Sequence, residues 1–363
     1  MKLLCVLLLF VFINIRHIGG NGIRIPLSIK EPQDYISNQM FYGTISIGTP
    51  PQKLNVTFDT TLDRTIVLSN WCESTADCQN RTIYNHKNSK TSRCVSYYCT
   101  RLADTFSMGD IQIQNVSFTH MSPSLRPLHD RLYAGAVGLH SHDRDYFLEH
   151  CKKLGLEKKF SFYTNYPWDH STSELMLCGE DKTKFRGNLQ YVAMITDTII
   201  PLGGWLIKTQ SVFLHHNDKS VRTMEFLDRV FIIEPDSPYI SVPRKDIDKI
   251  HEALHITTSK NGNLEEVDCK TVYTLPSITF RIADTDFTLE GNDYIQQLTQ
   301  NDQQVCIVRL IPQAYYHSDY WTMGNVFTRK FYTVIDAEKG RIGFAESIHG
   351  NRPEVFLYKR DSE

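Results

Sequence analysis

Two stretches of the chain place a carboxylic acid at the end of an apolar run and directly before a turn. In the first, residues 54–58 alternate apolar and polar side chains, which is the period of a half-buried strand, and Asp59-Thr60-Thr61 follows. In the second, Phe231-Ile232-Ile233 leads into Glu234-Pro235-Asp236-Ser237. A single acid of this kind is usually an ordinary turn residue. Two of them, each held at the mouth of a sheet, are groups suited to acid–base chemistry.

The surroundings of the two acids repeat as well. Ala136-Val137-Gly138 follows the first acid at a distance, and Thr322-Met323-Gly324 follows the second. A strand, an acid and a turn, followed later by a short run that ends in glycine, therefore occur twice. This pattern predicts a duplicated lobe with a cleft between the two copies.

The composition and the local sequence pattern predict a globular, mostly β protein. The chain has 363 residues, of which 41% are hydrophobic and 22% charged, and its formal net charge is −2. This length suits about two cores, and the mixed charge does not favour nucleic acid or an anionic membrane as a partner. Short strand-like runs separated by Gly, Pro, Asn and Asp recur along the chain, so we expect strands with only a few short helices.

Two segments have the period of a helix. The segment 143–154 places four apolar residues on one face and is followed by Gly155: Tyr146, Phe147, Cys151 and Leu154. The segment 243–255 begins at Pro243 and places three apolar residues on one face: Ile247, Ile250 and Leu254.

The second of these segments contains His251-Glu252-Ala253-Leu254-His255, which matches the H-E-x-x-H pattern of zinc metalloproteases. On a helix this spacing would bring both imidazoles to one face. The chain has 14 histidines, however, so a five-residue match arises easily by chance, and no clear third ligand follows. We therefore expect no metal and no cofactor in this protein.

The first residues predict export. Met1-Lys2 precedes an apolar run from Leu3 to Ile13, which is typical of a signal peptide and short for a membrane span. We expect cleavage near Gly20, so that residues 1–20 form the leader. The mature protein is then expected to be soluble and secreted, or delivered to an endolysosomal lumen. Three glycosylation sequons agree with export, at Asn55, Asn80 and Asn115.

The cysteines predict disulfides. Nine are present, and Cys5 falls in the leader, which leaves an even number for an exported chain. Cys72 and Cys78 enclose a tight loop, and a bond between Cys269 and Cys306 would staple a hairpin region. Spacing does not pair the remaining four, Cys94, Cys99, Cys151 and Cys178, and Cys151 could instead be a buried free thiol on a helix face.

The chain resembles the pepsin-like aspartic proteases over about residues 25–347. Residues 41–52, Phe-Tyr-Gly-Thr-Ile-Ser-Ile-Gly-Thr-Pro-Pro-Gln, are similar to the opening strands of that family, and residues 326–336 and 341–345 are similar to its closing strands. The resemblance implies a bilobal fold in which each β-rich lobe contributes one catalytic acid to a central cleft. It also supports the pairs Cys72–Cys78 and Cys269–Cys306.

The resulting organisation has five parts. They are the signal peptide 1–20, a residual prosegment or N-terminal strand at 21–36, an N-terminal lobe at 37–196, a C-terminal lobe at 197–348, and a polar tail at 349–363.

Catalysis in this family requires two carboxylates that share one proton and hold the attacking water, because like charges about 3 Å apart cannot both ionise. Each acid begins a turn with a hydroxyl residue, a glycine and a second hydroxyl residue. Asp59 and the bracing Thr60 fit this pattern, but Thr61 stands where glycine is expected and Leu62 where a hydroxyl is expected. The second acid is Glu234, which is one methylene longer than aspartate.

The second turn departs further from the family pattern. Pro235 replaces the bracing hydroxyl residue and has no N–H to donate, and Asp236 replaces glycine and adds a third carboxylate. An alternative register would make Asp236-Ser237-Pro238 the acid turn. That register keeps an aspartate and a hydroxyl, but it shifts the strand by two residues and still lacks glycine.

The flap and the prosegment also depart from the family. Tyr97 is a candidate flap residue, but its surroundings lack the family's glycines, and a Cys94–Cys99 bond would stiffen the hairpin. Residues 23–29 resemble the first strand of a prosegment, yet residues 30–35 already resemble a mature start. An exported protease would need a longer plug for its cleft, whereas an inactive homologue would not.

We therefore expect a monomeric homologue with a degraded Asp59 and Glu234 pair, which binds a peptide, a ligand or a protein rather than cleaving it. The alternative is a weak aspartic endopeptidase that uses the same two acids at acid pH.

Overall fold

The computed structural model describes residues 22–29, 40–69, 82–109, 111–121, 134–141, 146–166, 169, 171–195, 204–215, 222–258, 265–300, 303–313, 319–350 and 358–359. The leader, Cys72, Cys78 and the sequon at Asn80 lie outside the described residues.

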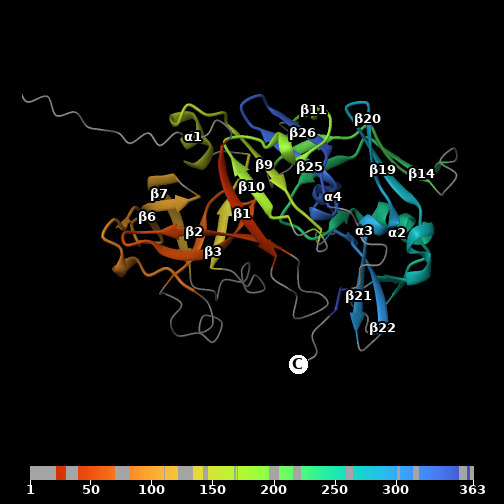
Figure 1. The fold of residues 1–363 in the computed structure, drawn as a ribbon, viewed down its shortest axis with the longest axis horizontal. Coiled ribbons are helices and arrows are strands. Elements are labelled where there is room, and N and C mark those ends of the chain that lie inside the picture. The colour runs from red at the N-terminus through yellow and green to blue at the C-terminus, as the bar shows by residue number, and fades with distance from the viewer. Residues whose placement is uncertain are drawn as a thin grey trace, which may run out of the picture.

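The largest sheet is built from both halves of the sequence (Figure 1). Its strands, in spatial order, are β11 (Gln190–Ala193), β26 (Arg341–Glu346), β25 (Phe331–Asp336), β9 (Lys159–Tyr163), β10 (Ser173–Leu177), β1 (Ile23–Ile29), β2 (Phe41–Ile47), β3 (Gln52–Asp59), β8 (Gly135–Gly138), β4 (Ile66–Leu68), β7 (Ile111–Met121), β6 (Arg101–Met108) and β5 (Arg93–Cys94). Strand β6 also pairs with β2, so β2, β3, β8, β4, β7 and β6 close into a barrel.

The second half of the chain adds three further sheets. The first has the order β12 (Leu206–Lys208), β15 (Val230–Ile233), β24 (Tyr320–Met323), β16 (Ile240–Val242) and β23 (Leu310–Pro312). The second has the order β14 (Arg222–Leu227), β13 (Ser211–His215), β19 (Ser277–Ile282) and β20 (Thr285–Leu289). The third has the order β17 (Thr257–Thr258), β18 (Glu265–Val267), β22 (Gln303–Val308), β21 (Ile295–Gln300) and β27 (Tyr358–Lys359).

The predicted duplication is present in the strand topology. In the first half, β2 pairs antiparallel with β3, β3 parallel with β8, β8 antiparallel with β4, and β4 parallel with β7. In the second half, β12, β15, β24, β16 and β23 repeat this order and these directions. In Figure 1, β2, β3, β6 and β7 of the first half lie on one side of β9, β10 and β25, and β14, β19, β21 and β22 of the second half lie on the other. We call β1, β9, β10 and β25 the joining sheet, because they bring strands from both halves of the sequence together. The fold is therefore the mostly β, two-lobed one that the resemblance implied.

Strand β1 is an integral part of this joining sheet. It lies between β10 and β2, and Ile23, Ile25 and Leu27 on one of its faces are buried. On the other face, Arg24 forms ion pairs with Glu174 at 2.9 Å and with Asp181 at 2.7 Å. Residues 23–29 are thus held by both apolar packing and charge.

The helices among the described residues are short: α1 (Tyr146–Lys153), α2 (Arg244–Ala253), α3 (Gly291–Tyr294) and α4 (Asn325–Lys330). Each of them is too short to cross a lipid bilayer. In α2 the predicted residues Ile247 and Ile250 are buried, and Leu254 is buried directly after the helix. In α1 the prediction holds for Cys151, which is buried with Leu148, and was wrong for Leu154, which lies beyond the helix and is 40% exposed. The side chains of Tyr146 and Phe147 lie outside those that the structure describes.

Three disulfides are present among the described residues, Cys94–Cys99, Cys151–Cys178 and Cys269–Cys306. The alternative of a free thiol at Cys151 is therefore wrong. Cys151–Cys178 fastens α1 to the end of β10, and both of its cysteines are buried.

Serine at both Cys151 and Cys178 should destabilise the protein more than serine at both Cys94 and Cys99. The first bond joins residues 27 apart and the second joins residues 5 apart, so loop entropy predicts losses of about 3.5 and about 2 kcal/mol. The buried hydroxyls of the first variant add to its loss. Urea unfolding of both variants measures the difference, and a larger loss at the exposed Cys94–Cys99 loop would contradict this ranking.

Candidate active site

Asp59 is the last residue of β3, at the point where this strand leaves the barrel beside the parallel strand β8. Its side chain is buried, and its Oδ1 atom accepts three hydrogen bonds. Two come from Thr61, from the backbone N–H at 2.8 Å and the hydroxyl at 2.7 Å, and one comes from the N–H of Leu62 at 3.1 Å. Thr61, which stands where the family has glycine, therefore helps to orient this acid.

Glu234 occupies the corresponding place in the second lobe. It follows β15 directly, beside the parallel strand β24, and its N–H donates to the carbonyl of Met323 at 3.0 Å. Its side chain is half-buried. The carboxyl ends of neighbouring parallel strands are the usual position for functional groups in such sheets.

Two glycines establish which residue of the second turn matches Asp59. A Cβ atom on Gly138 would lie 2.5 Å from the carbonyl oxygen of Leu62 and 2.7 Å from that of Arg64, the third and fifth residues after Asp59. A Cβ atom on Gly324 would lie 2.5 and 2.0 Å from the corresponding oxygens of the third and fifth residues after Glu234, which are Ser237 and Tyr239. Both loops therefore approach a glycine so closely that no side chain fits. This register places Glu234, and not Asp236, opposite Asp59.

The two turns are joined by a hydrogen bond that runs in one direction only. The buried hydroxyl of Thr60 donates to the carbonyl of Ile233, the residue before Glu234, at 2.8 Å. The residue that corresponds to Thr60 in the second lobe is Pro235, which has neither a hydroxyl nor an N–H. The reciprocal bond of a symmetric pair is therefore not possible.

Trp205 forms a second link between the lobes, which the sequence did not reveal. Its indole N–H donates to the carbonyl of Leu139 at 2.6 Å, and its own carbonyl accepts from the N–H of Ile233 at 3.0 Å. Leu139 in turn donates its N–H to the carbonyl of Asp59 at 2.8 Å. No motif surrounds Trp205, and only the packing of distant strands identifies it.

Three carboxyl groups meet between the lobes. One oxygen from each of Asp59, Glu234 and Asp236 lies within 4.8 Å of the other two. Asp236 is buried, so its charge is poorly screened. Three carboxylates at this spacing repel one another, and the cluster is relieved by keeping protons or by a cation. Among the described residues this is the one group of three such side chains close enough to hold an ion, and the expectation of no metal stays a prediction.

The other predicted site residues lie as follows. Ser237 closes the second turn, because its N–H donates to the carbonyl of Glu234 at 2.9 Å and its carbonyl accepts from the N–H of Asn325 at 2.6 Å. Tyr97 is 92% exposed on the loop closed by Cys94 and Cys99, and its ring packs edge-on against Tyr98. The structure therefore does not bring Tyr97 into contact with the two acids.

The H-E-x-x-H segment does not form a metal-binding helix face. Helix α2 ends at Ala253, and His255 lies beyond it with a φ of 51°. His251 is paired instead with Glu265 on β18, at 2.7 Å. The two histidines of the match therefore do not share one face of a helix, which fits a chance match to the H-E-x-x-H pattern.

The arrangement defines a two-lobed protein in which equivalent strand ends present one acid each to the boundary between the lobes. The family described as eukaryotic aspartyl protease matches residues 40–347. Renin-2 of Mus musculus is 27% identical over 334 residues, which cover 85% of this chain and 80% of the relative. Pregnancy-associated glycoprotein 6 of Ovis aries is 25% identical over 328 residues, 85% of this chain and 82% of the relative. Pepsin A of Rhinolophus ferrumequinum is 25% identical over 334 residues, 87% and 83% respectively.

The chain therefore belongs to the eukaryotic aspartyl protease family, as its opening and closing strands indicated.

Replacing Thr60 with valine should destabilise the protein by about 1–3 kcal/mol, because the buried carbonyl of Ile233 loses its side-chain donor. Thr285→Val is a matched control on β20, at a threonine whose hydroxyl makes no hydrogen bond in the structure, and it should change stability by less than about 0.5 kcal/mol. Urea unfolding at neutral pH measures both variants. Equal stability of the two variants would show that the link between the turns contributes little.

Proposed function

We propose that this protein is a non-proteolytic member of its family that binds a peptide or protein segment between its lobes. The observation that carries this proposal is the asymmetry of the two acid turns. Asp59 is oriented by three hydrogen bonds, whereas its counterpart is the longer Glu234, followed by Pro235. Catalytic groups must be placed to within about 0.5 Å, and one extra methylene moves a carboxylate by more than about 1 Å.

Asp236 adds a second obstacle to hydrolysis. Its oxygen lies within 4.8 Å of those of Asp59 and Glu234, so a third acid stands beside the two that would have to share a proton. The state that a paired-acid mechanism needs, one charged and one protonated carboxyl group around a water, then competes with other arrangements of the protons.

The second candidate function is a weak aspartic endopeptidase that works at acid pH. It is supported by the position of Glu234, which matches that of Asp59 relative to its own glycine, Gly324. It is also supported by the intact orientation of Asp59 through Thr61 and Leu62. In this reading Glu234 takes over the role of the second aspartate, at reduced rate.

Export to an oxidising compartment belongs to the same proposal. The three disulfides of the described residues are consistent with it, because such bonds persist outside the cytosol. Two of the sequon asparagines, Asn55 and Asn115, are exposed on strands β3 and β7 and would be accessible to a glycan.

The test is the cleavage of a denatured protein substrate between pH 3 and 6, with and without a statine-type inhibitor. We expect no inhibitable turnover from the natural chain. A variant that carries Thr61→Gly, Glu234→Asp, Pro235→Thr and Asp236→Gly should gain at least about a hundredfold in rate, because an error of about 1 Å at the reacting groups has that cost.

The matched control is the same fourfold variant with Asp59→Asn, which keeps the shape of the turn and should lose the gained activity. Inhibitable turnover by the natural chain that disappears in Asp59→Ala would reject the non-proteolytic proposal and support the weak endopeptidase. An absence of any gain in the fourfold variant would show that the acid turns are not what prevents hydrolysis.

A further inference from the structure

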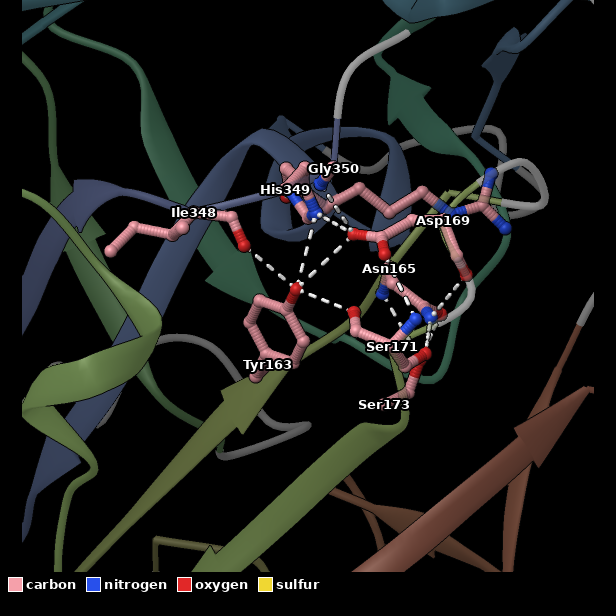
Figure 2. Close-up of polar contacts among 9 residues, drawn as sticks. Tyr163, Asn165, Asp169, Ser171, Ser173, Ile348, His349 and Gly350 are labelled. Carbon is pink, nitrogen blue, oxygen red and sulfur yellow. Dashed lines mark hydrogen bonds and ion pairs between the residues drawn. The ribbon is translucent and has the colours of Figure 1, made fainter.

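A second polar cluster lies on the joining sheet, away from the acid turns, and is centred on His349 (Figure 2). We call it the His349 clasp, and it consists of Tyr163, Asp169, Ser171, Ile348, His349 and Gly350. The side chains of His349 and Asp169 are only 13% and 6% exposed. They lie in contact although 180 positions separate them in the chain. The cluster connects the end of β9, the segment that leads into β10, and the residues that follow β26.

Both ring nitrogens of His349 face hydrogen-bond acceptors. Nδ1 lies 3.2 Å from a carboxylate oxygen of Asp169, and Nε2 lies 2.5 Å from the backbone carbonyl of Arg329 on α4. A neutral imidazole carries one N–H and would leave its other nitrogen facing an acceptor. The protonated imidazolium donates from both nitrogens, so it is the form that this geometry satisfies.

Two tyrosine rings pack against the imidazole, and the Tyr163 hydroxyl also lies 3.4 Å from Nδ1. The Tyr163 ring stacks on the imidazole at 5.5 Å and 23°, and the Tyr166 ring packs edge-on at 4.9 Å. The Tyr163 hydroxyl donates its single proton to the carbonyl of Ile348 at 2.8 Å, so it does not donate to Nδ1. The nearby charges of Lys184 and Arg329 are directed at aromatic rings, those of Tyr163 and Phe41.

Lys330 and Asp293 form a separate ion pair at 2.5 Å, which reaches the clasp only through the hydroxyl of Tyr166. Asp169 is therefore the charged group that faces the imidazole directly, at the turn between β9 and β10.

Asp169 is held in its charged form. Burial raises its pKa, but the backbone N–H groups of Ser171 and Gly350, with the Ser171 hydroxyl and His349, outweigh burial and lower it below the ordinary value. A carboxyl group whose pKa is lowered by folding stabilises the fold above its unfolded value of about 3.9, and this contribution is lost as the pH falls through the folded value. The carboxylate is thus available to His349 throughout the range in which imidazoles titrate.

We propose that the His349 clasp is stronger at acid pH than at neutral pH. In its protonated form the ring of His349 fastens residues 348–350 both to Asp169, between β9 and β10, and to α4. The clasp holds this segment at three consecutive residues, through the carbonyl of Ile348, the ring of His349 and the N–H of Gly350, which donates to Asp169 at 3.1 Å. When the ring loses its second proton, one of its two bonds is lost and a lone pair faces an acceptor. The segment is then held less tightly by the neutral ring than by the protonated one.

The proposal is independent of whether the acid turns are catalytic. The His349 clasp links α4 to β9 and β10. Strands β9 and β10 precede the second lobe in the chain, and α4 begins directly after Gly324, which packs against the second acid turn. The state of one histidine therefore acts at a junction of the two halves of the protein.

The test is hydrogen–deuterium exchange of the Gly350 amide in the full chain at pH 5 and pH 8, corrected for the intrinsic rate at each pH. We expect the protection of this amide to fall about tenfold between pH 5 and pH 8, as the loss of a hydrogen bond to a charged group predicts. In His349→Gln, whose amide does not titrate, protection should be low and equal at both pH values. His255→Gln, at an exposed histidine, is the matched control and should behave as the natural chain does.

Selective ¹³C labelling of histidine provides a second measurement on the natural chain, which decides the question even if His349→Gln does not fold. The His349 ring should be doubly protonated at pH 5 and should lose a proton before pH 8. A ring that is already neutral at pH 5, or equal protection of Gly350 at both pH values, would overturn the clasp.

Discussion

The placement of the two acids depends on the hydrogen bonds that cross between the lobes. Thr60 donates to the carbonyl that precedes Glu234, and Trp205 donates to Leu139, whose N–H is bonded to the carbonyl of Asp59. These bonds are buried, so each would leave an unsatisfied polar group if its partner moved away. They fix the ends of β3 and β15 relative to each other. The positions of Asp59 and Glu234, which stand at these strand ends, depend on this relation.

Around these bonds the two lobes repeat the same architecture with different chemistry. Each acid loop closes over a glycine, Gly138 or Gly324. In both loops the carbonyl oxygens of the third and fifth residues after the acid approach that glycine. The first turn retains donors for its carboxylate, while the second has Pro235 and an additional buried acid, Asp236. The duplicated fold thus accommodates different side chains in its two acid turns, because the backbone contacts that shape the loops do not involve those side chains.

The sheet that joins the lobes supplies the remaining rigidity. Strand β1 is fastened in it by buried apolar residues and by Arg24, and the end of β26 continues into the segment that is bound around His349. The second polar cluster therefore lies where strands from both halves of the sequence meet. The charge of a protonated His349 therefore acts on β9, β10 and α4, and α4 begins directly after Gly324 of the second acid turn.

The sequence by itself determined the family and the mostly β, two-lobed fold, and it singled out Asp59 and Glu234 as candidate acids, because these features rest on local strand–turn patterns. It favoured Glu234 over Asp236 as the second acid but left the alternative register open, since that choice depends on the register of β15 against β24 and on the approach of Gly324. It also missed the donation from Thr61 to Asp59, which depends on the exact course of one turn. The contacts of Trp205 and His349 join residues 66 and 180 positions apart, so only the tertiary structure decides them.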